Sequence, residues 1–156
     1  MIQFKKIVLC TDLSENANAA IPYAVELARR YDGTIFLVHI FEEDIYYASM
    51  AAGPIELPEQ AKWVSEARQD REQRLAGLAK SLGDKEGVHV VHLMRQGHAA
   101  NMIVTFAKAE DANCIVIATH GRTGFSHLMF GSVAERVVQL SHCPVLSVRP
   151  QTVAAK

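Results

Sequence analysis

The sequence predicts one α/β domain built on an open, twisted sheet of five parallel strands with helices on both faces. Five short apolar runs alternate with helical patterns, the order that a parallel sheet with right-handed crossovers requires. Several runs are continuously apolar, which is typical of strands covered on both faces. The chain has 156 residues, 49% of them hydrophobic and 21% charged, which suits one globular domain. We assign residues 1–150 to this domain and 151–156 to a short C-terminal tail.

The first half of the predicted domain is a strand, a helix and a second strand. The first apolar run is Ile7–Cys10, and apolar residues then recur at helical spacing from Glu15 to Tyr31. Pro22 lies inside this pattern, either in the first turns or at a kink, so the residue at which the helix begins stays open. Asp32-Gly33 ends the helix, and TIFLVHI at Thr34–Ile40 is the second strand.

The middle of the chain is less regular. The stretch Phe41–Leu57 is long for a loop in a compact domain, and it forms either a lid over a ligand or a surface for a partner. A charged helix with one solvated face follows from Pro58 to about Leu82, and Gly83–Gly87 is a turn. The next strand is Val88–Met94, and its two histidines indicate a position near an edge of the sheet.

In the last third of the chain, predicted helices and strands alternate again. It contains a short helix at Gly97–Lys108 and a strand at Asn113–Thr119, which is apolar enough to be central. A second helix follows at Ser132–Leu140, and its opening residues Ser132 to Glu135 fit a capping box, in which the serine and glutamate side chains satisfy the first backbone N–H groups. The last strand is Val145–Val148.

Composition argues against several classes of partner. The formal net charge is −1, so no overall basic field attracts nucleic acid or an anionic membrane. No apolar run approaches the ~20 residues of a membrane helix, and the N-terminal run is too short for a signal peptide. The three cysteines are widely spaced and form no CxxC, and Cys10 and Cys114 lie in apolar runs, which indicates core residues rather than a disulfide framework or a zinc site. We expect a cytoplasmic protein with neither nucleic acid nor membrane as a partner.

Polar residues follow three of the predicted strands. They are Thr11-Asp12 after the first strand, the loop after Ile40, and Thr119-His120-Gly121 after the fourth. In open parallel sheets, ligands bind beyond the carboxyl ends of the strands, where the strand order reverses. We expect these three segments to meet at a binding site.

The third segment leads into a glycine-containing loop that ends at a helix start. Gly121, Gly124 and Gly131 can adopt positive φ and allow the backbone to approach a ligand. The free N–H groups and dipole at Ser132 favour an anion such as phosphate, and the guanidinium of Arg122 fits phosphate oxygens.

Asp12, at the end of the first strand, is an acceptor suited to ribose hydroxyls. His120, beside the loop, either contacts phosphate or is a turn residue. The plain alternative for the whole loop is that its glycines shape a turn and Ser132 caps a helix.

Other nucleotide and catalytic signatures are missing from the sequence. It contains no GxGxxG, no GxxxxGK[ST] and no GxSxG, which argues against an ordinary dinucleotide site, a Walker-type triphosphatase and an acyl-transfer enzyme. No carboxylate pair for magnesium and no general base is evident. Asp12 is the acidic candidate, and it is better suited to the ribose.

Four segments of the chain resemble the universal stress protein family. They are KKIVLCTDLSENANAAIPYAVELA, LVHI, IVIATHGRTGFSHLMFGSVAERV and CPVLSVRP, and the resemblance is weakest from Phe41 to Gly87. It implies a Rossmann-like fold of the adenine nucleotide alpha hydrolase type. It also implies a homodimer in which the last strands, here Val145, Leu146, Ser147 and Val148, pair antiparallel across a twofold axis.

The nucleotide-binding members share the pattern Gly, two residues, Gly, nine residues, Gly, then Ser or Thr. In this sequence Gly121, Gly131 and Ser132 match the pattern, but Ala118 stands at the first glycine. The resemblance implies that ATP or AMP, with Mg²⁺ as an optional counter-ion, is the ligand. The residues that it assigns are Thr11 and Asp12 for the ribose, the Ile40 backbone for the adenine, and Gly121, Gly131, Ser132 and Val133 for the phosphates.

Three functional hypotheses follow from these observations. The first is a stress-response regulatory protein that binds an adenine nucleotide without robust turnover and acts on a regulatory protein partner. The second is a slow ATP hydrolase or a kinase-like phosphotransferase. The third is a stress protein that has lost nucleotide binding and acts through protein contacts alone, a reading that the methyl group of Ala118 supports.

Overall fold

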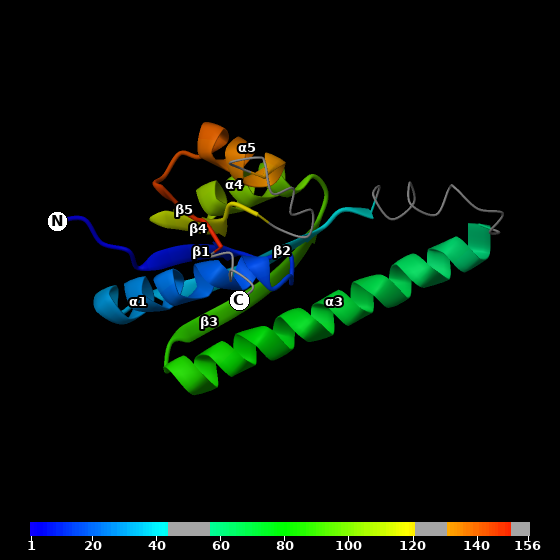
Figure 1. The fold of residues 1–156 in the computed structure, drawn as a ribbon, viewed down its shortest axis with the longest axis horizontal. Coiled ribbons are helices and arrows are strands. Elements are labelled where there is room, and N and C mark those ends of the chain that lie inside the picture. The colour runs from blue at the N-terminus through cyan, green and yellow to red at the C-terminus, as the bar shows by residue number, and fades with distance from the viewer. Residues whose placement is uncertain (44–56, 121–130, 151–156) are drawn as a thin grey trace, which may run out of the picture.

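The computed structural model describes residues 1–43, 57–120 and 131–150, and within these ranges it contains one five-stranded parallel sheet. The strand order is β3-β2-β1-β4-β5, so β2, β1 and β4 are interior and β3 and β5 are edges. The fold is α/β with an all-parallel sheet, as the sequence predicts (Figure 1). The strands are β1 (Lys6–Cys10), β2 (Thr34–Phe41), β3 (His89–Gln96), β4 (Cys114–Ala118) and β5 (Val145–Val148).

The helix predicted from Glu15 is two elements. A 3-10 helix, η1 (Asn16–Ala20), leads into α1 (Ile21–Tyr31), and Pro22 lies in the first turn of α1. Proline is tolerated there because the first N–H groups of a helix have no intrahelical acceptor. The remaining described helices are α3 (Leu57–Glu86), α4 (Ala99–Ala109) and α5 (Ser132–Leu140).

The turn predicted at Gly83–Gly87 is wrong, because α3 continues through it to Glu86. Arg29 of α1 stabilises this extra turn, donating to the Glu86 carbonyl oxygen at 2.8 Å and to its carboxylate at 2.7 Å. A guanidinium that satisfies the last carbonyl groups is favourable at the negative end of the helix dipole. Gly87 follows the last helical residue, and its φ of +65° is the left-handed conformation of a C-terminal cap.

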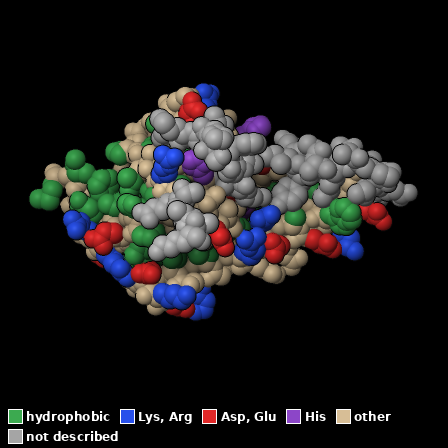
Figure 2. Space-filling view, viewed as in Figure 1, with side chains coloured by type: hydrophobic (Ala, Val, Ile, Leu, Met, Phe, Trp, Pro, Cys, Tyr) green, Lys and Arg blue, Asp and Glu red, His purple; other side chains and the backbone are tan. Residues whose placement is uncertain are grey.

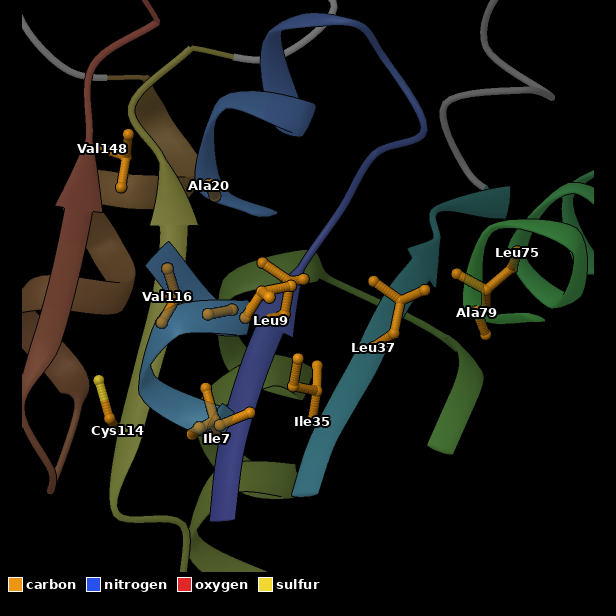
Figure 3. Packing of buried hydrophobic residues seen from close by; sticks show 13 residues of the cluster. Ile7, Leu9, Ala20, Ile35, Leu37, Leu75, Ala79, Cys114, Val116 and Val148 are labelled. Carbon is orange, nitrogen blue, oxygen red and sulfur yellow. The ribbon is translucent and has the colours of Figure 1, made fainter. Parts of the chain in front are cut away.

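Alternate residues of the strands pack against different helices. Ile7 and Leu9 of β1 belong to a core with Ala24 of α1 and Leu75 of α3. Val8 and Cys10 belong to the opposite core, which contains Ile103 and Phe106 of α4 and Val137 of α5. Figure 3 shows Ile7, Leu9, Ile35 and Leu37 directed to the same side of the sheet, with Leu75 and Ala79 of α3 beside them. Helices α1 and α3 thus cover one face and α4 and α5 the other (Figure 1).

Helix α3 extends beyond the sheet at its amino-terminal end (Figure 1). Its 30 residues span about 45 Å, whereas the eight residues of β2 span about 26 Å. Three ion pairs at i,i+4 lie along the helix, Lys62–Glu66, Asp70–Arg74 and Lys80–Asp84, and Figure 2 shows charges of both signs next to each other there. In the described ranges, no helix is both long and apolar enough to cross a membrane.

The histidines of β3 lie where the sequence places them. His89 and His92 are exposed on this edge strand, and Thr34 Oγ1 lies 3.2 Å from His89 Nδ1. No group of three or more His, Cys, Asp or Glu within the described ranges is arranged to hold a metal ion.

Candidate functional site

A pocket of about 410 Å³ lies at the carboxyl ends of β1, β2 and β4. It occupies the point where the chain reverses the direction of strand addition, since β2 lies on one side of β1 and β4 on the other. The first turns of α4 and α5 complete its walls. The residues that contribute most to the chemistry below are Thr11, Asp12, His39, Ile40, Glu42, Ala99, Ala118, Thr119, His120, Gly131, Ser132 and Val133.

The β1 end of the pocket is a tight turn held by its own side chains. Thr11 is buried, its N–H donates to the Val38 carbonyl at 3.0 Å, and its hydroxyl accepts from the Leu13 N–H at 3.0 Å. Asp12 Oδ1 accepts from the Ser14 N–H at 3.0 Å and from the Ser14 hydroxyl at 2.5 Å. Leu13 takes a φ of +63° to complete the turn. These bonds fix the Asp12 carboxylate at the edge of the pocket.

The β2 end contributes two polar residues that the sequence reasoning missed. His39 is 1% exposed and its Nδ1 lies 2.9 Å from the Thr11 carbonyl oxygen, so Nδ1 is the protonated nitrogen. Glu42 is half-buried, and its Oε1 accepts from the Ala99 N–H at 2.9 Å, at the first residue of α4. The available signals were a histidine inside an apolar strand and an acid just after it.

The β4 end meets the start of α5 through backbone contacts. The Thr119 N–H donates to the Val148 carbonyl at 2.8 Å, and the Gly131 N–H donates to the Thr119 carbonyl at 2.5 Å. Thr119 Oγ1 and His120 Nδ1 are 2.9 Å apart, and both residues line the pocket. Strand β4 and helix α5 are therefore joined at the pocket wall.

The predicted capping box at Ser132 is wrong. Gly131 is the N-cap, Ser132 is already the first helical residue, and no side chain within the described ranges caps the helix. The Gly131 carbonyl accepts the Glu135 N–H at 3.0 Å, while the Glu135 carboxylate accepts from Gln139 at 3.3 Å. The N–H groups of residues 132–134 precede the first intrahelical bond and so have no acceptor within the helix.

Gly131 is required for space and not for a positive φ, which corrects one sequence expectation. Its φ is −70° and its ψ 149°, an ordinary extended conformation. A Cβ at this position would lie 2.8 Å from the Thr119 carbonyl oxygen. The glycine permits β4 and α5 to approach each other closely.

The described part of the lining contains two acidic side chains. They belong to Asp12 and Glu42, and no Lys or Arg lines that part of the pocket. The positive potential comes from the first turn of α5, where the N–H groups of three residues converge at the positive end of the helix dipole. Cys10 forms part of the floor, and burial, followed by the influence of Cys114, raises the pKa of its thiol. The thiol of Cys10 therefore stays uncharged and is not a nucleophile in the pocket.

The structure brings eight of the eleven predicted site residues to this one pocket. They are Thr11, Asp12, Ile40, Ala118, His120, Gly131, Ser132 and Val133. Gly121, Arg122 and Gly124, like most of Phe41–Leu57, lie outside the described residues. The roles of all eleven toward a ligand remain predictions.

The pocket and topology can be compared with known proteins. The model of the universal stress protein family matches residues 3–149. The chain belongs to the universal stress protein family. Universal stress protein MJ0531 of Methanocaldococcus jannaschii is 34% identical to this family member over 146 residues, which cover 94% of this chain and 82% of the relative.

Solved structures share the fold of this universal stress protein. The structure of protein MJ0577 superposes with a TM-score of 0.84 at 24% identity, covering 97% of this chain and 99% of that one. A universal stress protein from Archaeoglobus fulgidus in complex with dAMP superposes with a TM-score of 0.65 at 24% identity, covering 95% of this chain and 99% of that one.

Proposed function

We propose that this protein binds an adenine nucleotide, ATP or AMP, in the pocket and acts as a cytoplasmic stress-response regulator that presents its liganded form to a protein partner. The observation that carries the proposal is the meeting of an exposed helix start with a fixed carboxylate in one pocket. Ser132 and Val133 open α5, and Asp12 lies at the adjacent strand end. Backbone N–H groups at a helix start suit phosphate, and a carboxylate suits ribose hydroxyls.

The strand order supports a definite direction for the ligand. Strands β4, β1 and β2 are consecutive neighbours, each about 4.8 Å from the next. The phosphates lie beside α5 at the β4 side, the ribose at Asp12 in the middle, and the base at Ile40 on the β2 side. The base side is the apolar part of the lining, with Val38, Ile40 and Ile103. A related fold from Archaeoglobus fulgidus in complex with dAMP is consistent with a ligand of this class.

The test is a melting-temperature measurement with millimolar ATP-Mg or AMP, with phosphate release assayed in parallel. A ligand that binds the native state raises stability by about 2.7 kcal/mol at one hundred times its Kd. We expect a rise in melting temperature with at least one nucleotide and no sustained phosphate release. No rise with either nucleotide would favour a stress protein that acts through protein contacts alone. Sustained release abolished by Asp12→Ala would favour a slow ATP hydrolase.

Ala118 is expected to lower nucleotide affinity. It is the last residue of β4, it is partly buried, and it lines the pocket where the family pattern has glycine. The Ala118→Gly variant should bind AMP several-fold more tightly, because the backbone can then approach the ligand. It should also lose about 0.5–1 kcal/mol of stability, since glycine gains more entropy on unfolding. Calorimetric titration measures the first effect and denaturant unfolding the second. Unchanged or weaker binding would contradict this role for the methyl group.

We also propose that two chains pair through β5. Pro144 O accepts from the Ile115 N–H at 3.0 Å and Val148 O from the Thr119 N–H at 2.8 Å, so the alternate residues Val145 and Ser147 direct their backbone groups to the outer edge. A bare edge strand invites pairing, and closed twofold association covers it.

Ser147→Pro should weaken the dimer at least tenfold. Proline removes an outward N–H donor and is tolerated on an edge strand, so the fold should persist. Sedimentation velocity over a concentration series measures the effect, with Ser147→Ala as the control that keeps the N–H. An intact dimer in Ser147→Pro, or a monomeric wild type at micromolar concentration, would contradict pairing through β5.

A further inference from the structure

Glu42 is a carboxylate in the half of the pocket that the proposed function leaves to the base. It directly follows Phe41, the last residue of β2, and it lines the pocket together with Ile40. Ala99 and Ile103 of α4 line the pocket beside it. A partly buried charge among such apolar neighbours needs donors to remain stable.

One donor is already present, and it fixes how the carboxylate lies. Oε1 accepts the Ala99 N–H at 2.9 Å, at the positive end of the α4 dipole. Within residues 1–43, 57–120 and 131–150, Glu42 has no second hydrogen bond and no cationic partner. The carboxylate thus offers the pocket one further acceptor oxygen, held in place by the backbone of α4.

We propose that this second oxygen selects the base, by accepting a hydrogen bond from the exocyclic 6-amino group of adenine. The assignment rests on the proposed function and names the residue that would give it specificity. A carboxylate only accepts, so it opposes the carbonyl oxygen that hypoxanthine and guanine carry at the same ring position. Guanine also carries two adjacent donors, its N1–H and its 2-amino group. These would pair best with a carboxylate that has both oxygens free, whereas one oxygen of Glu42 already accepts from Ala99.

Glu42→Gln replaces the free, accepting oxygen of the carboxylate with a donating NH₂ group. The Ala99 N–H still needs an acceptor, so the amide oxygen takes the place of Oε1 and the NH₂ group takes the place of the free oxygen. The start of α4 is preserved and the pocket now presents a donor to position 6 of the purine. A site built around one hydrogen bond discriminates strongly against an analogue that leaves its polar group unpaired.

The experiment compares AMP with IMP, which differ in the group at position 6 and the protonation of the adjacent ring nitrogen. Calorimetric titration should show the wild type binding AMP at least tenfold more tightly than IMP. In Glu42→Gln the ratio of AMP affinity to IMP affinity should fall at least tenfold, so that IMP binds as tightly as AMP or more tightly. Glu43→Gln is the matched control, because Glu43 accepts from Gln96 and lies outside this pocket, and its ratio should equal that of the wild type.

The outcomes separate this assignment from the function on which it rests. Equal affinity of the wild type for AMP and IMP, or an unchanged ratio in Glu42→Gln, overturns the role of Glu42 while nucleotide binding stands. Failure of the wild type to bind either nucleotide overturns the proposed function and the assignment with it. The melting temperatures of the wild type, Glu42→Gln and Glu43→Gln without ligand show whether each variant is folded when its AMP-to-IMP affinity ratio is measured.

Discussion

Replacing Gly131 with valine is expected to lower nucleotide affinity by about 100-fold or more. The Gly131 N–H donates to the Thr119 carbonyl at 2.5 Å, and even a Cβ would lie 2.8 Å from that oxygen. Because the obstructing atom belongs to the backbone, relief requires β4 and α5 to separate. The separation would displace the N–H groups of Ser132 and Val133, which we propose hold the phosphates. Calorimetric titration with AMP and ATP-Mg measures the loss.

The loss of binding must be distinguished from general destabilisation. Gly131→Ala carries the same Cβ without the valine methyl groups and should lie between wild type and valine in affinity. Gly33→Ala is the matched control, since its Cβ would lie 2.6 Å from the Phe4 carbonyl oxygen, away from the pocket. It should lower the melting temperature, as overpacking costs about 1–3 kcal/mol, and leave the affinity of the folded protein unchanged. Wild-type affinity in Gly131→Val would contradict the phosphate site.

The strands could be predicted because their sequence patterns are local. Ile7–Cys10 and Thr34–Ile40 are apolar on both sides, and the structure covers both sides with helices. The last strand, Val145–Val148, has the predicted bounds. The length of α3 was not predictable in this way, because Arg29 stabilises its last turn from 57 positions away in the sequence.

The candidate pocket was predictable in outline and not in its polar detail. Strand ends followed by polar residues indicated where Asp12 and His120 would meet. The bonds from His39 to the Thr11 carbonyl and from Ala99 to Glu42 depend on which strands and helices become neighbours, and no local pattern encodes them. Gly131 shows the same limit, since the requirement for glycine comes from the Thr119 carbonyl and not from its own φ.

Asp12→Asn should also have a large effect. We expect it to lower AMP affinity by about 10- to 100-fold, because a hydrogen bond to a charged group contributes about 1.5–3 kcal/mol. Asparagine keeps an oxygen that can accept the Ser14 N–H, which Asp12 Oδ1 accepts at 3.0 Å, so the turn should persist. It replaces the other oxygen and the negative charge with an NH₂ group, which donates and cannot accept from a ribose hydroxyl. The melting temperature without ligand should change little.

A ligand without ribose hydroxyls shows whether Asp12 acts through the ribose. The wild type should prefer AMP to its 2′,3′-dideoxy analogue. Asp12→Asn should lose most of that preference, because the charge-assisted hydrogen bond that a ribose hydroxyl donates to a carboxylate cannot form with an NH₂ group. Asp111→Asn makes the same change of charge at an exposed position outside the pocket, so it controls for the altered net charge and should bind both ligands as the wild type does. If Asp12→Asn retains the full preference for AMP, Asp12 serves the turn and another group meets the ribose. If affinity falls equally for both ligands, the carboxylate acts on the nucleotide at a position other than the hydroxyls, and the direction proposed for the ligand across β4, β1 and β2 is wrong.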